Sequence, residues 1–389
     1  MNILFVNHYY NLFANADSGA SQRSMRLINA LAQFAHVDVL SFVKDTISNA
    51  PNVDVVDIPC VSDDSIKEGG RLSKFVRLFK IHSPYSFYPP NRTKEAVIDS
   101  VVSQHDYQFI VTHYLHPACY YGLFKYADKL VVDLDDDPKD AMKILATTVK
   151  STRNRIYTYI SAYTWGCITR YVTSRIYHSF YSSPNKHYPN ATFLPNVSGF
   201  EQPLPTTAFN QSQPCALLVG DYTYFPNKEG LTHFLRKIFP TVRQKLPNAT
   251  LKVVGKMNDE SLLSLCKNTI GVELRGYVND LRQEYLTCQC VIVPLYKGTG
   301  TSVKVIEAMS LGRLVVSTPC GVRGLHRDFR EGKDYLLAKS NRDFADKLVF
   351  ALTNESKNNE LAMSAIRKVN KHYSQEAYNS IVRKTFIIK

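Results

Sequence analysis

One stretch in the C-terminal half combines an apolar strand, a loop of small residues and an amphipathic helix, in that order. Gly298 and Gly300 in the loop let the backbone approach a ligand closely. The first helical turn, Thr301 to Val303, presents unpaired N–H groups and a partial positive charge to a phosphate. Lys304 and Glu307 are three residues apart and share a helix face near that end. Taken alone, the pattern fits a phosphate site and an ordinary strand-turn-helix connection equally well.

Two histidines follow another predicted strand, Phe109 to Thr112, at its carboxyl end. In an open α/β sheet, side chains at that edge can face a ligand. His113 and His116 are therefore candidate catalytic residues. The alternative is that both are structural.

Short β-branched runs alternate with helical patterns along most of the 389 residues, which is typical of parallel sheets built from βαβ units. A stretch rich in proline and small polar residues separates two such series. We predict an α/β protein with two Rossmann-like domains, residues 1–202 and 215–371, joined by the linker 203–214. A helix at about 372–389 is expected to pack back on the first domain. The predicted strands are 3–6, 37–42, 53–58, 109–112 and 130–134, then 215–220, 251–255, 272–276, 290–295 and 314–318.

The chain has a formal net charge of +13, and its basic residues are unevenly distributed. Residues 141–200 contain no acidic side chain, while basic and aromatic residues alternate there. Arg71, Lys74, Arg77 and Lys80 recur every three residues, which predicts a basic amphipathic helix unless they are simply a solvated face. Both segments lie in the first half, so we expect that half to lie on an anionic membrane surface.

Other features of the sequence indicate where in the cell the protein is expected to act. Apolar runs are far shorter than the roughly 20 residues that a membrane-spanning helix needs. The N-terminus goes directly into a strand pattern without a basic leader, and the eight cysteines are dispersed. We expect a reduced, cytoplasmic protein, peripheral on the inner face of the membrane.

The stretch KVIEAMSLGRLVVST and the loop 319–325 after it resemble the donor-binding motif of the retaining GT-B glycosyltransferases of family 4. Segments 219–235, 246–256 and 274–285 look like the same family's successive β-α units, in order. The resemblance covers roughly residues 200–370 and extends to the N-terminal half in outline. It implies a GT-B fold, in which two parallel sheets face an interdomain cleft.

The resemblance also implies roles for residues of the second domain. Glu307 would hydrogen-bond the nucleotide ribose, and Lys228 would pair the diphosphate. The arginine that usually precedes this lysine is replaced by Asp221, so we expect a further charge from Lys297 or Lys304. Main-chain groups of the glycine loop would hold the sugar and diphosphate: Gly298, Thr299, Gly300, Thr301, Ser302 and Val303. Thr299 stands where the family usually has a glutamate, which leaves the donor sugar open.

In the first domain, the segment GASQR resembles the family's glycine loop that faces the donor phosphates, so Gly19 and Arg23 are candidates. An ordinary helix entry is the alternative. His116 matches the place where the family commonly has a histidine, with His113 in reserve. The aspartates between Asp133 and Asp137 suggest a metal site, but we set this aside, because helix ends and basic side chains neutralise the diphosphate in this architecture. We expect no metal and no other cofactor.

The function that the resemblance implies is transfer of a sugar from a UDP- or GDP-linked donor, with retention, to a glycan or lipid-linked glycan in cell-surface polysaccharide synthesis. A nucleotide-sugar epimerase on the same fold is one alternative. A basic nucleic-acid binder is another, although the sequence contains no recognised nucleic-acid module, and we expect no nucleic-acid partner.

Overall fold

The computed structural model describes residues 1–8, 12, 19–42, 50–56, 90–183, 187–200 and 213–387. The chain forms two compact units, one of Met1–Pro195 with Tyr378–Lys389, and one of Asn196–Ala377. The division falls at Pro195, where the sequence predicts residue 202. The basic segment from Arg71 to Lys80 and most of the predicted linker lie outside the described residues.

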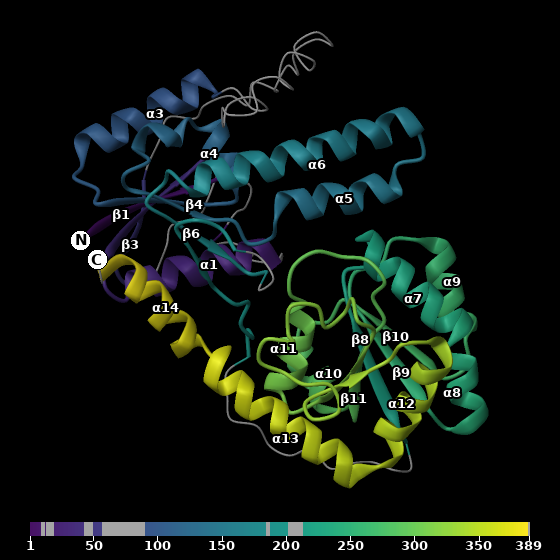
Figure 1. The fold of residues 1–389 in the computed structure, drawn as a ribbon. Helices are drawn as coiled ribbons and strands as arrows, with labels where there is room; N and C mark the ends of the chain where they lie inside the picture. Colours follow the sequence, from purple (N-terminus) through teal and green to yellow (C-terminus); the bar gives the residue numbers. More distant parts are fainter. Residues whose placement is uncertain are drawn as a thin grey trace. The chain divides into compact units, whose positions relative to one another are not determined.

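The N-terminal unit is built on a seven-stranded parallel sheet in the order β3-β2-β1-β4-β5-β6-β7 (Figure 1). The first six strands follow the order of a Rossmann fold. The strands are β1 (Asn2–Asn7), β2 (His36–Ser41), β3 (Val53–Val55), β4 (Phe109–His113), β5 (Leu130–Asp133), β6 (His178–Tyr181) and β7 (Ala191–Phe193). The helices between them are α1 (Gly19–Ala32), α3 (Arg92–Gln104), α4 (Leu115–Tyr120), η2 (Leu123–Tyr126), α5 (Pro138–Thr148) and α6 (Thr152–Thr173).

The C-terminal helix α14 (Gln375–Ile387) packs on this N-terminal sheet with its last three turns. Phe386 meets the ring of Phe109 edge-on, with 4.9 Å between ring centroids. Tyr177 donates to the carbonyl of Thr385 at 3.4 Å. Tyr378 is 1% exposed and is therefore part of the core of the unit. The chain thus returns to its first unit at the end.

The C-terminal unit repeats the same order in a six-stranded parallel sheet, β10-β9-β8-β11-β12-β13. Its strands are β8 (Cys215–Val219), β9 (Thr250–Val254), β10 (Val272–Gly276), β11 (Cys290–Val293), β12 (Leu314–Ser317) and β13 (Leu336–Leu337). Its helices are α7 (Phe225–Lys237), α8 (Phe239–Lys245), α9 (Glu260–Asn268), α10 (Leu281–Leu286), α11 (Val303–Ser310), α12 (Asn341–Thr353) and α13 (Glu355–His372).

Alternate side chains of these strands enter two separate apolar cores, one on each face of the sheet. Leu218 and Ile292 pack with α7, α8 and α12, whereas Leu217 and Val291 pack with α11 and α13. Because both faces are covered at the centre of the sheet, the central strands β8, β11 and β12 are almost entirely apolar, as is typical of parallel sheets, whereas β9 and β10 toward the edge carry charged side chains.

The predicted α/β fold with two parallel sheets is confirmed, and nine of the ten predicted strands occur within about two residues of their expected bounds. The exception is β3, which ends at Val55, and residues 57 and 58 of its predicted range lie outside the described residues. Strands β6, β7 and β13 were missed: β6 and β7 are short and carry polar side chains, and β13 consists of two leucines alone. In the described parts of the chain, no helix is long and apolar enough to cross a membrane.

Candidate functional site

Strand order identifies where a ligand can bind in the C-terminal unit. The chain leaves β8 toward one edge of the sheet and β11 toward the other, so their carboxyl ends form the switch point at which open α/β sheets bind ligands. Helix α7 approaches this point closely, because a Cβ on Gly230 would lie 2.4 Å from the carbonyl oxygen of Pro294. A larger side chain at this position would push the helix away from the strand end.

The glycine loop and the start of α11 form one side of this point. Gly298 has a φ of 149°, which an L side chain rarely adopts, so the loop conformation depends on glycine there. Ser302 caps the helix in an extended conformation without a side-chain cap bond. The first N–H groups of α11 therefore point toward the end of the sheet, where they can meet an anion.

Lys304 lies inside this edge of the sheet. Its Nζ donates to Oδ1 of Asn227 at 2.8 Å, and Asn227 in turn donates to the carbonyl of Asp221 at 2.8 Å. The side chain keeps some exposed surface, yet burial lowers the pKa of Lys304 to about 8, and the nearby Glu307 only partly offsets this. A buried ammonium with only a neutral amide as hydrogen-bond partner gains from an anionic ligand.

Glu307 is held by a buried tyrosine. The phenol of Tyr285 donates to Oε2 of Glu307 at 3.0 Å, and its ring is 0% exposed. Burial, with the adjacent Glu307 carboxylate, raises the pKa of Tyr285 well above its usual value, so the phenol stays protonated and remains a donor. One carboxylate oxygen is thereby oriented from α10, while the residue as a whole remains partly exposed.

The two other lysines that the sequence offers for a diphosphate are paired in the structure. Lys228 forms an ion pair with Asp259, which holds the pKa of that carboxyl well below its usual value. Lys297 pairs with Glu229 at 3.0 Å. Both pairs are partly exposed, and ion pairs of this kind contribute little stability. Lys304 is therefore the lysine whose local environment most favours an incoming anion.

Arg323 extends this site from the loop after β12. Its guanidinium donates to the carbonyl of Thr299 and, at 2.6 Å, to that of Cys320. A Cβ on Gly298 would lie 2.7 Å from Nη2 of Arg323, so the guanidinium lies directly on the glycine loop. A cavity of about 330 Å³ opens beside this contact and is lined by Tyr296, Thr318, Cys320, Lys339 and Asn341, among others.

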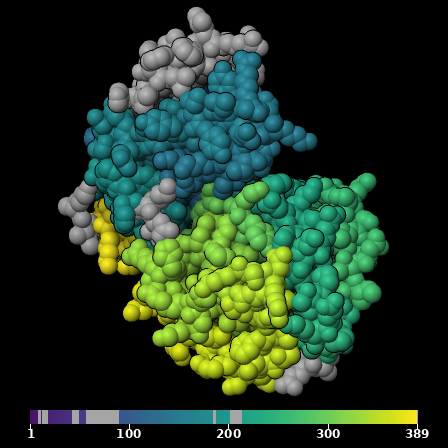
Figure 2. Space-filling model, turned by 45° about the vertical axis from the view of Figure 1, so that its right-hand side comes forward, coloured from purple at the N-terminus to yellow at the C-terminus, as the bar shows by residue number. Residues whose placement is uncertain are grey.

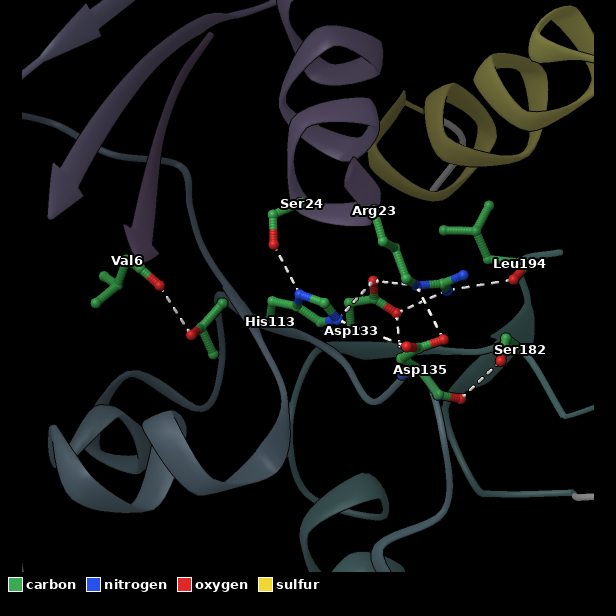
Figure 3. Close-up of polar contacts among 9 residues, drawn as sticks. Val6, Arg23, Ser24, His113, Asp133, Asp135, Ser182 and Leu194 are labelled. Carbon is green, nitrogen blue, oxygen red and sulfur yellow. Dashed lines mark hydrogen bonds and ion pairs between the residues drawn. The ribbon is translucent and has the colours of Figure 1, made fainter. Parts of the chain in front are cut away.

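The N-terminal unit has a buried charged cluster at the carboxyl edge of its own sheet (Figure 3). Nε and Nη2 of Arg23 donate to the two oxygens of Asp133 at 2.7 and 2.9 Å, and Arg23 lies 3.4 Å from Asp135. Asp133 pairs with His113 in the sheet register, and Ser24 bonds to Nδ1 of His113 at 2.7 Å. Arg23, His113 and Asp133 are at most 6% exposed, so this network is part of the interior.

The cluster places two of the predicted site residues in the interior. Burial lowers the pKa of His113, and its Nε2 has no hydrogen-bond partner. Arg23, predicted to face a donor phosphate, instead neutralises Asp133. Gly19 opens helix α1, and a Cβ there would meet nothing within 4 Å.

His116 lies among aromatic rings at the same edge. Its ring stacks on that of Tyr120, with 6.0 Å between the ring centroids. It also meets the ring of His8, the residue after β1, edge-on with 5.6 Å between the centroids. Burial lowers the pKa of His116 to about 4, so its imidazole is neutral near pH 7. Tyr114, between the two histidines, has a φ of 69°, an uncommon conformation for a non-glycine residue that is often found at functional sites.

The aspartates between Asp133 and Asp137 have structural partners. Asp133 is paired with Arg23, and Asp137 caps α5 by accepting from the N–H of Lys139 at 2.8 Å. Among the described residues, potential metal ligands gather elsewhere, at His36, Asp38 and Asp54. These lie at the amino ends of β2 and β3, which is the opposite edge from the one described above.

The sequence did not single out several residues of these sites. Tyr285 and Asn227 lie inside segments that carried the family resemblance, but their side-chain roles depend on packing between helices that are far apart in the chain. Arg323 lies in the loop 319–325, and His8 in the loop after β1. For Arg323 and His8, the only signal in the sequence was a position after a predicted strand, and many residues at such positions are unrelated to function.

Comparison with known proteins identifies the architecture. Residues 213–354 match the family model Glycosyl transferases group 1. A curated relative, an uncharacterized 44.6 kDa protein in the cps region of Klebsiella pneumoniae, is 24% identical over 200 residues. That match covers 49% of this chain and 51% of the relative, about half of each.

Solved structures of similar fold match along nearly the whole chain. Sucrose-phosphate synthase from Thermosynechococcus elongatus has a TM-score of 0.68 at 16% identity, with 100% of both chains covered. WaaG, a glycosyltransferase involved in lipopolysaccharide biosynthesis, has a TM-score of 0.64 at 16% identity, covering 98% of this chain and 99% of its own. Anabaena Alr3699/HepE, solved in complex with UDP and glucose, has a TM-score of 0.63 at 14% identity, covering 100% and 99%. The chain therefore has the GT-B fold, and its residues 213–354 match the model of the glycosyl transferases group 1 family.

Proposed function

We propose that the protein is a glycosyltransferase that takes a sugar from a UDP- or GDP-linked donor bound at the β8–β11 edge of its C-terminal unit. The observation that carries this proposal is the arrangement of Lys304 and Glu307 on one helix directly after the glycine loop. The helix start and Lys304 suit a diphosphate, while the carboxylate held by Tyr285 suits a ribose hydroxyl. UDP in the solved structure of Alr3699/HepE supports the nucleotide assignment.

We infer that the acceptor is a glycan or a lipid-linked glycan and that the reaction belongs to cell-surface polysaccharide synthesis at the inner face of the membrane. The relative from a cps region and the involvement of WaaG in lipopolysaccharide biosynthesis support this assignment. His116, a neutral imidazole at the carboxyl edge of the other sheet, is the candidate catalytic residue. We propose that the anomeric configuration is retained and that no metal takes part.

Donor binding is the first test of this proposal. Thermal unfolding of the full chain with UDP, GDP and an oligonucleotide measures which ligand binds the native state, since a ligand at about 100 times its Kd adds about 2.7 kcal/mol. We expect a nucleoside diphosphate to raise the unfolding temperature and Glu307→Ala to remove most of that rise. Glu360→Ala, an exposed surface variant, is the matched control. Stabilisation by the oligonucleotide alone would contradict the proposal.

Product analysis tests the reaction itself. Incubation with nucleotide sugars, with and without acceptor, separates transfer from epimerisation, because an epimerase alters the donor without any acceptor. The proton coupling at the new anomeric centre reports retention or inversion. Addition of a chelator should leave the rate unchanged if no divalent ion takes part.

A further inference from the structure

Helices α5 and α6 form an antiparallel hairpin (Figure 1). Large apolar side chains of both helices are exposed to solvent. On this hairpin, Leu145 is 47% exposed, Ile156 55%, Tyr159 47% and Tyr163 63%. An exposed leucine or tyrosine alone needs no explanation, but a contiguous group of them marks an interaction surface. Figure 2 shows the atoms of this part of the chain, coloured blue to teal, at the surface of the molecule.

The exposed side chains form a stripe along α6. Tyr159 and Tyr163 follow Ile156 at three and seven residues, so all three point to the same side of the helix. The opposite side carries Trp165 and Ile168, which are buried in the core of the N-terminal unit. The core therefore holds the helix from behind, and among the described residues of the unit no element packs on the stripe along its outer side.

Basic residues border this stripe on both sides. At 3.6 residues per turn, Arg155 lies next to Tyr159 on one side of the stripe, and Arg153 lies beyond Ile156 on the other. Lys143 and Lys150 add positive charge at the end of the hairpin, and both are exposed. The first acidic residue after Asp140 is Glu201, so no carboxylate of this segment competes for these charges.

We propose that the stripe of Ile156, Tyr159 and Tyr163, with Arg153 and Arg155 beside it, docks the protein on an anionic lipid bilayer. Tyrosines suit the membrane interface, because their rings enter the acyl boundary while their hydroxyls stay with water and headgroups. The aliphatic Leu145 and Ile156 gain from burial in acyl chains, whereas a nucleic acid would offer them no comparable environment. Arginines beside the stripe meet the negative headgroups.

This inference deepens the proposed function, because it names the surface that would bring the enzyme to a lipid-linked acceptor. It rests on other residues than donor binding does. The residues named for membrane docking differ from those named for donor binding, so each proposal can fail while the other stands.

Vesicle co-sedimentation of the full chain tests the proposal. We expect binding to vesicles of phosphatidylcholine with phosphatidylglycerol, weak binding to phosphatidylcholine alone, and a decrease with salt. Arg153→Gln with Arg155→Gln should lower the partition coefficient at least about tenfold. Tyr159→Ser with Tyr163→Ser should also lower it, and its residual binding should keep the preference for anionic vesicles. Lys267→Gln with Ile270→Ser, which alters an equally exposed basic and apolar pair in the C-terminal unit, should bind as the parent does.

Three results would overturn the inference. Hairpin variants could bind anionic vesicles as tightly as the parent, the parent could fail to bind them, or sedimentation equilibrium could show that the stripe joins two copies of the chain. Loss of oligonucleotide binding in the hairpin variants, without loss of vesicle binding, would assign the surface to nucleic acid instead. Stabilisation by UDP or GDP, measured on the same variants, should be unchanged and reports the donor site independently.

Discussion

The phenol of Tyr285 donates to Oε2 of Glu307 at 3.0 Å, so a fully buried residue of α10 orients a carboxylate of α11 at the edge of the sheet. This hydrogen bond holds Oε2, and because the carboxylate is planar, the position of Oε1 follows from it. Tyr285 is a positioning residue: it acts on the nucleotide through Glu307.

Tyr285→Phe keeps the buried ring and removes only the donor. We expect the Kd for the nucleoside diphosphate to rise about tenfold, since hydrogen bonds to charged groups contribute about 1.5–3 kcal/mol. Titration calorimetry measures this change. In a Glu307→Ala background the same substitution should have no further effect on Kd, because its partner is gone. Equal losses in both backgrounds would mean that Tyr285 acts on the fold rather than on Glu307.

Lys304 should make nucleotide binding depend on pH. Burial lowers its pKa to about 8 in the free protein, and a bound diphosphate would raise it again. Binding near pH 8 should therefore take up a proton, and the affinity should fall as the pH rises through about 8. Calorimetry in buffers of different ionisation enthalpy measures the uptake. Lys304→Met should bind more weakly and take up no proton, whereas Lys267→Met is expected to behave as the parent.

The same depressed pKa affects stability, and the sign can be worked out. Between about 8 and the unfolded value of about 10.4, the unfolded chain binds more protons at Lys304 than the folded chain does. The cost of burying the ammonium is thus fully present below pH 8 and is relieved as the pH rises toward 10.4. Lys304→Met should lose this increase in stability with pH.

The strands and the donor stretch could be predicted from sequence because both depend on local pattern. Apolar runs such as Cys290–Val293 identify strands wherever they pack, and the loop-helix stretch keeps its order of residue types. The partners of the predicted lysines could not be predicted. Lys228 and Asp259 are 31 residues apart and belong to different helices, so nothing in the local sequence indicates that they pair.

The surroundings of the candidate site residues in the N-terminal unit could not be predicted from the sequence either, for a related reason. Arg23 and Asp133 are 110 residues apart, and only the sheet order brings α1 next to the end of β5. Sequence reasoning offered Arg23 as a residue that could face the donor phosphates, but it had no information on which carboxylate would neutralise it. His113 ends strand β4 and His116 lies three residues later. Packing distinguishes them: His116 is partly exposed, whereas His113 lies in the interior.

His116 should affect the chemical step and not donor binding. His116→Phe keeps a ring against Tyr120 and removes the nitrogen atoms, so we expect kcat to fall about 100-fold if the imidazole takes part in proton transfer. The Kd for the nucleotide should remain unchanged. Because its pKa lies near 4, ionisation of His116 should not shape the rate profile above about pH 5. The control is His187→Asn, an exposed histidine of the same unit. An unchanged kcat would remove His116 from the mechanism.

The buried pair of Arg23 and Asp133 should matter for stability. Asp133 is 0% exposed, and although burial would raise its pKa, the adjacent guanidinium holds that pKa below its usual value. Arg23→Met leaves the carboxylate buried without a cation, which should cost about 3–5 kcal/mol in the free energy of unfolding. Arg23→Met with Asp133→Leu removes both charges and should recover most of the loss, which would identify the cost as that of an uncompensated charge.

Fluorescence can follow this change in one unit alone, because the single tryptophan, Trp165, lies in the core of the N-terminal unit. The stability that the ion pair contributes is fully present above the unfolded pKa of aspartate, about 3.9. It is lost as the pH falls toward the lower pKa that Asp133 has in the folded protein. Urea unfolding should therefore show a difference between parent and Arg23→Met that narrows in acid, since protonated Asp133 no longer needs a cation. A difference that does not change with pH would mean that Arg23 stabilises the unit through packing of its stem instead of through its charge.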